Sequence, residues 1–468
     1  MGIHRECPLV QRIDHFLYSP AYLLFIGGLT ILANIFCLEM VSYTAILVTA
    51  VYICLFARDI LPLFPMFACG YISPSMGNNP GLNSESIFSF RNGGLYLSIL
   101  LGVVIICLFY RLITDPDFGG KQFWTKKRRL LPGMLLLGAA YVLSGVASGQ
   151  WEEYGWRNLF FAIAQFGAIA FLYFLLSGGV RWDHAPKAYL FWTGICVGYV
   201  LLAELINIYI VNRVIEDGCI MRERIYTGWG HYNNIGAMLA MMIPLPFFLT
   251  GKGRYAWFAY FSAFLFCIGL LFTCSRGSIL VGVPICAATY ILSLVHSRHA
   301  RSIRWVHIIV IGVPLLMLIF FHSELSRLFK VLPELGFDSW QRMETYVEGF
   351  KQFLKFPIFG GSFFPVDFWP YAWGNAPVYT ALFPPRWHNT LVQLVATGGI
   401  TCFAAYVYHR VQTFGLFTKN FSTEKLFAGL SITALLLTSM VDCHMFNIGP
   451  VLFYSATLAI VEFQLNKK

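Results

Sequence analysis

Long apolar stretches recur along the whole chain, and they constrain its fold more than any other feature. Of the 468 residues, 57% are hydrophobic and only 12% are charged, and the mean hydropathy is +0.65. A soluble globular protein carries about 25% charged residues. One aqueous core cannot bury so much apolar surface, so the sequence predicts an all-α, polytopic membrane protein.

The apolar stretches have the length of membrane spans, because about 20 apolar residues in a helix cross the hydrocarbon core of a bilayer. Fourteen candidate spans are present, at residues 21–38, 41–57, 60–73, 94–112, 130–148, 158–176, 188–211, 233–249, 255–273, 277–295, 304–321, 389–408, 426–441 and 449–465. The third is short and contains prolines, so a re-entrant segment is its alternative. We therefore expect about 12–14 transmembrane helices in a GT-C-like arrangement.

The distribution of Lys and Arg predicts the orientation of these spans. Most cations lie in short clusters between apolar runs, such as KKRR at 126–129, and the positive-inside rule places such clusters in the cytoplasm. Both termini are then cytoplasmic, and the long polar loop 322–388 lies outside the cytoplasmic (inner) membrane. This pattern also accounts for the net charge of +10 without a nucleic-acid partner.

The twelve cysteines do not have the spacing of a disulfide scaffold. Most of them lie inside apolar spans, where a free thiol behaves as a small hydrophobe. Cys219, Cys274 and Cys443 lie on the predicted outer side, where they can pair or stay free. We expect no disulfide framework.

The long loop is expected to carry an amphipathic helix in residues 339–356. Its apolar side chains recur at three- and four-residue steps, which predicts one apolar helix face. These side chains are Trp340, Met343, Val347, Phe350 and Leu354. We expect the helix to lie flat at the outer membrane interface and to end at Pro357.

An aromatic run at 359–387 follows this helix. Tyr and Trp are common anchors at a membrane interface. Aromatic ring faces also suit sugar rings, and the prolines of the run favour a fixed shape. The sequence leaves both interpretations open.

Five of the arginines on the predicted outer side stand out, because the positive-inside rule disfavours cations there. They are Arg222, Arg224, Arg276, Arg342 and Arg386. A guanidinium group presents a fixed fork of donors to phosphate oxygens and stays charged where water is scarce. Arg276 also precedes a helix, whose N-terminal N–H groups and dipole favour an anion. Two or three of these side chains around one cavity would bind a diphosphate, and the alternative for each is an interface anchor.

His388 begins the span at 389–408 and is a candidate general base. The dipole at a helix N-terminus disfavours imidazolium, and a neutral imidazole can accept a proton at neutral pH. A histidine that only satisfies the interface fits the pattern equally well. Asn389 is most simply the helix cap. Glu204 lies inside a span, where a carboxyl group is expected to have a function or a polar partner.

Several catalytic motifs are absent from the sequence. It contains no HExxH, no CxxC pair, no Walker loop and no GxSxG, so neither a metal nor another cofactor is expected. Asp115-Pro116-Asp117 has the D-x-D form of nucleotide-sugar enzymes. It lies in a basic inner loop, so we interpret it as a turn.

Four motifs in a fixed order resemble one family. They are R-x3-G with N-N-x-G (Arg224 to Gly236), T-x-S-R-G (Thr273 to Gly277), R-x3-Y with P-I-x-G-G (Arg342 to Gly361) and H-N-x3-Q-x4-G-G (His388 to Gly399). Together with the long outer loop, this set is similar to the O-antigen ligase and polymerase superfamily of bacterial membrane glycosyltransferases. The resemblance covers roughly residues 220–450. It departs from the usual form at His231-Tyr232, where a proline more often precedes the Asn.

The resemblance implies a metal-independent, inverting transfer of a glycan carried on undecaprenyl diphosphate. Arg224 and Arg276 match the family arginines that bind the diphosphate, and His388 matches the base that activates the acceptor hydroxyl. Arg342 matches a loop arginine. His388 and Arg276 are therefore the predicted catalytic residues, and the predicted substrate-binding residues are Arg224, Arg276, Arg342, Arg386 and Asn389. Residues 213–468 would form the catalytic region, and residues 1–212 an N-terminal transmembrane bundle.

The expected function is polymerisation or ligation of lipid-linked glycan at the outer face of the membrane. Both reactions use the same donor, and a slight preference for a surface-polysaccharide polymerase rests on the lack of any feature for a lipid A–core acceptor. Expected partners are this donor, a glycan or lipid-linked acceptor, the bilayer and a chain-length regulator. The alternative is a lipid-linked oligosaccharide flippase or transporter, which needs cations along a transmembrane path and often repeated halves. A non-catalytic assembly scaffold would leave Arg276 and His388 unexplained.

Overall fold

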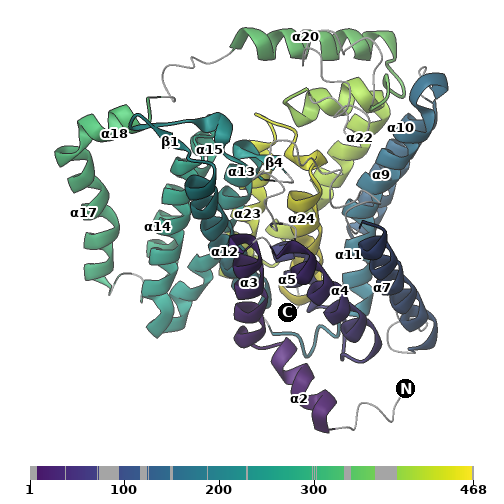
Figure 1. Ribbon diagram of the computed structural model, residues 1–468. Coiled ribbons are helices and arrows are strands. Elements are labelled where there is room, and N and C mark those ends of the chain that lie inside the picture. The colour runs from purple at the N-terminus through teal and green to yellow at the C-terminus, as the bar shows by residue number, and fades with distance from the viewer. Residues whose placement is uncertain are drawn as a thin grey trace.

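Helices make up nearly all of the computed structural model (Figure 1). The structure describes residues 8–36, 38–70, 72, 94–115, 124, 126–147, 151–186, 188–227, 230–297, 299, 301, 303–330, 339–363 and 387–465. The only strands in these residues form two hairpins with two residues in each strand. The prediction of an all-α fold is confirmed.

Helices of the first half of the chain pack with one another and with helices of the second half. Their bounds are α2 Pro8–Leu17, α3 Pro20–Ile35, α4 Glu39–Leu55, α5 Leu63–Gly70, α7 Gly94–Thr114, α9 Leu131–Ala147, α10 Trp151–Phe166, the π-helical turn η3 Gly167–Phe171, α11 Leu172–Gly179 and α12 Tyr189–Val211. Helix α9 packs against α10 and against α22, and α11 packs against α24.

The second half begins with the two hairpins, β1 Ile215–Glu216 with β2 Cys219–Ile220 and β3 Tyr226–Thr227 with β4 Gly230–His231, around the short helix η4 Arg222–Arg224. The helices that follow are α13 Tyr232–Met242, η5 Leu245–Tyr255, α14 Ala256–Phe272, α15 Arg276–His296, α17 Arg304–Phe320, α18 His322–Leu328, α20 Ser339–Lys355, α22 Thr390–Thr418, α23 Thr423–Thr438, η8 His444–Phe446, α24 Ile448–Ile460 and η9 Val461–Leu465. The predicted amphipathic helix is α20.

Five helices in the described part of the chain are long and apolar enough to cross a membrane. Two bent pairs, α2 with α3 and α17 with α18, also pass this test, and five shorter apolar helices join them. With each bent pair counted as one span, seven segments of the described residues pass the test, and the expected number of 12–14 spans stays a prediction. The chain is therefore a polytopic membrane protein.

The third predicted span is too short to cross a bilayer. It contains the buried helix α5, whose eight residues rise about 12 Å, against a hydrocarbon core about 30 Å thick. The alternative of a re-entrant segment fits this helix.

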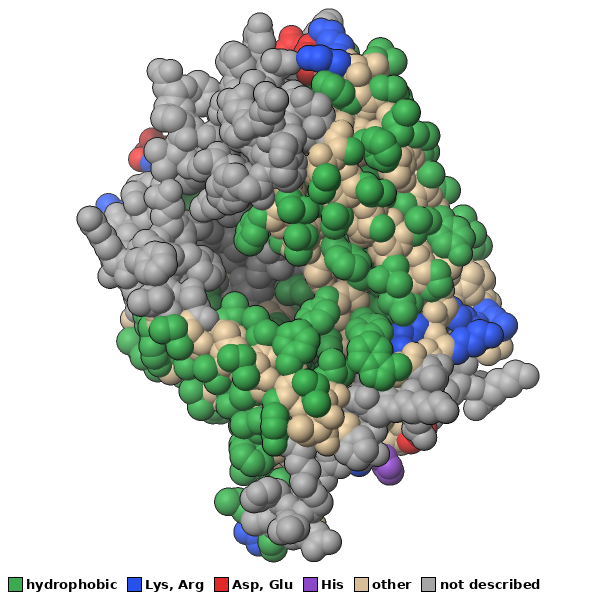
Figure 2. Space-filling view, turned by 90° about the vertical axis from the view of Figure 1, so that its right-hand side faces the viewer, with side chains coloured by type: hydrophobic (Ala, Val, Ile, Leu, Met, Phe, Trp, Pro, Cys, Tyr) green, Lys and Arg blue, Asp and Glu red, His purple; other side chains and the backbone are tan. Residues whose placement is uncertain are grey.

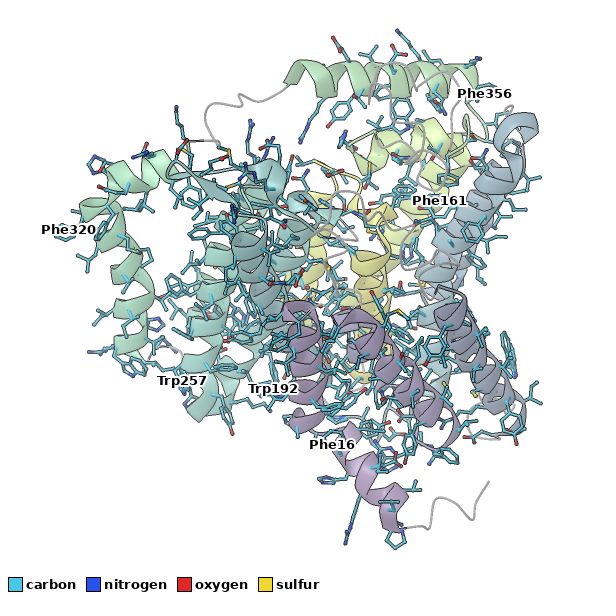
Figure 3. The ribbon with its side chains drawn as sticks, viewed as in Figure 1. Phe16, Phe161, Trp192, Trp257, Phe320 and Phe356 are labelled. Carbon is cyan, nitrogen blue, oxygen red and sulfur yellow. The ribbon has the colours of Figure 1, made fainter. Side chains whose placement is uncertain are left out.

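The outer surface of the helices is apolar, as a lipid-facing surface requires. Helix α17 buries one residue, Val306, and its end exposes Phe320 (Figure 3). In Figure 2 hydrophobic side chains cover much of the visible face, with charged side chains at its upper end and along its lower edge. No disulfide links any of the cysteines in the described ranges.

Segments from the predicted inner side meet at one end of the bundle. Gln464 donates a hydrogen bond to Ala185 O (2.8 Å), and Glu462 accepts one from Arg129 N (2.6 Å). Helix α2 lies at this end, whereas α20 lies at the opposite end, crossing the ends of other helices (Figure 1).

Helix α22 is broken at Gly399, and the turn after α20 fills the break. Gly399 has φ +61°, which an L-residue rarely adopts. Beyond it, Ile400 N donates to Pro357 O (2.9 Å) and Thr401 N donates to Ile358 O (3.2 Å). On the near side, Gly361 N donates to Ala396 O (2.9 Å). Backbone groups released by the break therefore bond to the turn, which fixes α20 to a span.

Gly360→Ala should destabilise this junction. A Cβ at Gly360 would lie 2.2 Å from the backbone carbon of Thr397, at φ +77°, and that conformation alone costs about 1–2 kcal/mol. We expect a lower midpoint of thermal unfolding for the purified protein in detergent. Gly415→Ala on α22 is the matched control, because its Cβ would meet nothing within 4 Å. Equal midpoints for the two variants would contradict the prediction.

Candidate active site

The carboxylate of Asp442 is the centre of a polar cluster at the α20 end of the bundle. It lies just after α23, and its side chain is 4% exposed. Oδ2 accepts a hydrogen bond from Asn233 Nδ2 (3.1 Å), and Oδ1 accepts one from Cys443 N (2.7 Å). His388 Nδ1 lies 3.4 Å from Oδ1. The buried carboxylate therefore faces the Nδ1 side of the imidazole ring.

His388 has a left-handed backbone, with φ +51°. Such a conformation persists where its surroundings determine it. On one side the backbone N–H of the buried Trp387 donates to Gln393 Oε1 (2.9 Å). On the other side Asn389 Oδ1 caps α22 by accepting from Leu391 N (2.8 Å) and from the next residue. Hydrogen bonds of the two neighbouring residues therefore hold the backbone of His388 on both sides.

Gln393 links the chain segment that carries His388 to the segment that carries Asp442. Its Oε1 also accepts from Cys443 Sγ (3.4 Å), the residue after Asp442. In the sequence, Gln393 was identified only as a position of a motif, and Asp442 was not predicted as a site residue. The sequence did show that Asp442 is an acidic residue directly after the span 426–441 on the predicted outer side. Nothing in the sequence identified its partner.

Arg276 reaches the cluster through its neighbours. It is the first residue of α15, after Ser275, whose hydroxyl donates to Asn233 Oδ1 (2.8 Å). Asn233 therefore contacts both Ser275 and Asp442. Gly277 packs so closely on Val441 that a Cβ would lie 2.4 Å from Val441 Cγ1. Arg276 is thus placed beside the segment that carries Asp442.

Helix α20 contributes two side chains to the cluster around Asp442. Arg342 Nη1 donates to Val441 O (3.3 Å), and Tyr346 donates its hydroxyl proton to His388 O (3.3 Å). Burial raises the pKa of Tyr346, so its phenol keeps the proton that this bond requires. The structure therefore brings His388, Arg276 and Arg342 together around Asp442 and the residue before it.

The other predicted cations have different surroundings. Arg224 is ion-paired with Glu216 (2.6 Å) and donates to Arg213 O (2.8 Å) in the β1–β2 region. Arg222 instead stacks over the ring of Tyr232, with its Cζ 4.7 Å from the ring centroid, one residue before Asn233. Arg386 lies outside the described residues, as does most of the aromatic run at 359–387.

Two carboxylates noted in the sequence have structural partners. Glu204 accepts a hydrogen bond from Asn34 Nδ2 (2.7 Å), and Asp115 pairs with Arg111 (3.5 Å) at the end of α7. Within the described ranges no group of three or more His, Cys, Asp or Glu side chains could hold a metal ion.

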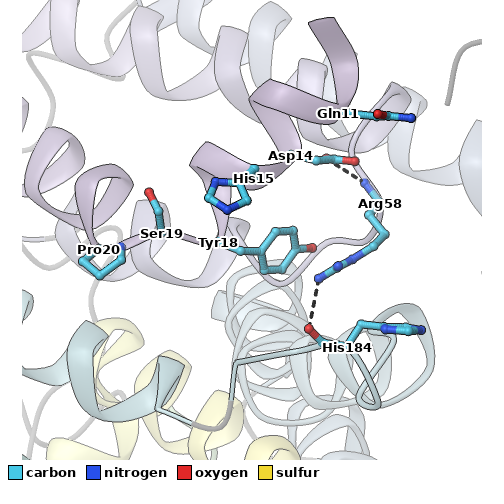
Figure 4. A pocket seen from close by; sticks show the side chains of 8 residues that line it. All are labelled: Gln11, Asp14, His15, Tyr18, Ser19, Pro20, Arg58 and His184. Atoms are coloured by element: carbon cyan, nitrogen blue, oxygen red, sulfur yellow. Dashed lines mark hydrogen bonds between the residues drawn. The ribbon is translucent and has the colours of Figure 1, made fainter. Parts of the chain in front are cut away.

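A pocket of about 540 Å³ lies at the other end of the bundle, beside α2 (Figure 4). Arg58 crosses it: its backbone N donates to Asp14 Oδ1 (3.0 Å) and its Nη2 to His184 O (3.3 Å). Its guanidinium carbon lies 4.2 Å from the Tyr18 ring centroid. These contacts tie α2 to the turn before α12, far from His388.

The fold defines a polytopic, all-α membrane protein with a cluster of arginine, histidine and carboxylate groups at one end. Residues 261–407 match the family model described as O-antigen ligase, which confirms the predicted resemblance. This part of the chain is similar to the O-antigen ligase family, and the match supports a membrane enzyme of that type. It includes Arg276, Arg342 and His388 but neither Arg224 nor Asp442. No match to the chain was found among curated proteins.

Asn389→Ala should cost stability through loss of the α22 cap. The Asn389 side chain caps the helix and also donates to Met440 O (2.9 Å), so we expect a loss of about 1–2 kcal/mol in thermal unfolding. Ser422→Ala, at the cap of α23, is the control for an ordinary cap loss away from the site. An Asn389→Ala protein as stable as the parent would show that the cap contributes nothing.

Proposed function

We propose that the protein transfers or polymerises glycan from undecaprenyl diphosphate onto an acceptor hydroxyl at the outer face of the cytoplasmic membrane. The family match supports this proposal. The observation that carries it is the convergence of the His388–Asp442 pair with Arg276 and Arg342 at one end of a membrane bundle.

In the proposed reaction the acceptor oxygen attacks the anomeric carbon of the donor sugar opposite the diphosphate. The new C–O bond forms as the bond to the diphosphate oxygen breaks, and the diphosphate leaves with the electron pair, so the anomeric configuration inverts. His388 Nδ1 faces Asp442, which leaves Nε2 to take the hydroxyl proton. Asp442 orients the ring and stabilises the resulting imidazolium. A contact of 3.4 Å can tighten when substrate is bound.

The departing diphosphate needs positive charge and hydrogen-bond donors. Arg276 supplies a guanidinium at the N-terminus of α15, where Ser275 does not use its side chain as a cap. The first N–H groups of that helix and its dipole therefore favour an anion. Arg342 supplies a second cation, and Arg222 is a third candidate from its position over Tyr232. Stabilisation of the developing charge is the main catalytic task.

This mechanism assigns no step to a metal ion, because the leaving group is already a diphosphate and arginines provide the countercharge. It also requires the α20 end to face outward. Cationic segments such as 126–129 would then lie in the cytoplasm with both termini. Arg224, Arg386 and Asn389 remain predicted substrate contacts, and Asn389 would act there in addition to capping α22.

Purified protein supplied with a lipid-diphosphate glycan should extend or transfer it in the presence of EDTA. His388→Ala should lower turnover about 10²–10⁴-fold, the usual contribution of a general base, while donor binding is kept. Gel analysis of the glycan measures turnover, and lengthening without added acceptor would identify a polymerase. Complete inhibition by EDTA, or near-normal turnover of His388→Ala, would defeat the mechanism.

Arg276→Ala should weaken binding of the lipid-diphosphate donor, and Arg276→Lys should restore it only in part, because an ammonium group lacks the planar fork of donors. Binding of a fluorescent donor analogue to protein in nanodiscs measures both effects. Arg301→Ala is the matched control, since Arg301 belongs to the predicted inner side. An Arg276→Lys protein that binds the donor as tightly as the parent would argue against bidentate contact.

A further inference from the structure

Helix α20 has three distinct faces. Arg342, Tyr346 and Gly349 face the bundle, where Arg342 and Tyr346 bond to the site and a Cβ at Gly349 would meet Val392 and Trp387. Because successive residues turn by about 100°, Glu344, Glu348, Lys351 and Lys355 form a second, charged face. The third face is an apolar stripe formed by Met343, Val347, Phe350 and Leu354.

The stripe is not covered by the described part of the protein. Its four side chains are between 48% and 74% exposed. They recur at four-, three- and four-residue steps along one side of the helix, so they form one continuous surface. A contiguous exposed apolar surface of this kind marks an interaction site.

The stripe continues into the surface of a membrane-spanning helix. Four residues beyond Leu354, in the turn after α20, lies Ile358, which is 59% exposed. Its carbonyl accepts bonds from Thr401 N (3.2 Å) and Thr401 Oγ1 (2.7 Å) on α22. The neighbouring Ile400 is 50% exposed and belongs to the candidate span Thr390–Thr418. An exposed isoleucine within a span faces lipid, so the stripe is continuous with a lipid-facing surface.

We propose that the apolar stripe of α20 is buried in the outer leaflet of the lipid bilayer. The helix lies across the ends of other helices (Figure 1), the orientation of an interfacial amphipathic helix, and its charged face stays in water. The bilayer and the bundle hold α20 from two sides, which sets Arg342 and Tyr346 at the level of lipid phosphates. The consequence of this placement of Arg342 for catalysis rests on the proposed function, whereas the contact of the stripe with lipid does not.

The test uses the full-length protein in nanodiscs, with an environment-sensitive fluorophore on Phe350→Cys or on Glu348→Cys. The two positions are two residues apart but lie on opposite sides of the helix. Unsubstituted protein carried through the same labelling gives the background from native cysteines. We expect the label at 350 to have blue-shifted emission and to lose most of its intensity with lipids bearing a shallow nitroxide. The label at 348 should instead be quenched by aqueous iodide.

Iodide quenching at both positions would place the stripe in water and overturn the proposal. Shielding of position 350 from both quenchers would mean that protein covers the stripe, and it would overturn it equally. Far-UV circular dichroism and gel filtration identify a variant that fails to fold, and Leu354→Cys then replaces Phe350→Cys. Because no arm measures glycan transfer, failure here leaves the proposed function intact, and failure of the transfer assay leaves the lipid contact intact.

Discussion

The buried carboxylate of Asp442 is the group on which the candidate site depends. A carboxylate away from water needs hydrogen bonds or positive charge around it. Asn233 and the backbone of Cys443 provide the bonds, and His388 faces the same oxygen as Cys443. These partners come from three separated parts of the chain. The carboxylate thus bonds to the start of α13 and faces the imidazole at the start of α22.

A second constraint, the break in α22, decides how the outer helix is held. A break inside a span exposes backbone groups that lipid cannot satisfy. Here the turn after α20 supplies partners through Pro357, Ile358 and Gly361. Two glycines with positive φ make this approach possible, because Gly360 lies against the backbone of Thr397 and Gly399 lies against the backbone of Ile358. As a result the C-terminal end of α20 is anchored to the break in α22, and the bundle-facing Arg342 and Tyr346 bond to Val441 and His388.

Much of the fold followed from residue patterns alone. The apolar stretches predicted the long helices to within a few residues, for example α12 and α15, because the length of a span is set by bilayer thickness. The spacing of Met343, Val347, Phe350 and Leu354 predicted α20, because apolar residues at three- and four-residue steps form one face of an α-helix. Of the candidate site, the ordered motifs named Arg276, Arg342 and His388, whose roles stay predictions; in the structure Arg342 bonds to Val441 and His388 faces Asp442. Asp442 was missed, because a single acidic residue after a span has no pattern that names its partner.

The sequence by itself determined the class of protein, the helical architecture and the residue types available for chemistry, since these depend on composition and on contacts between near neighbours in the chain. Only the tertiary structure decided which polar groups meet. It placed Asp442 against His388, put Gln393 between their two segments, and engaged Arg224 with Glu216 while Arg222 stacks on Tyr232. Such pairings join residues from different helices, and they depend on how the helices pack and where their backbones break. No local propensity encodes them.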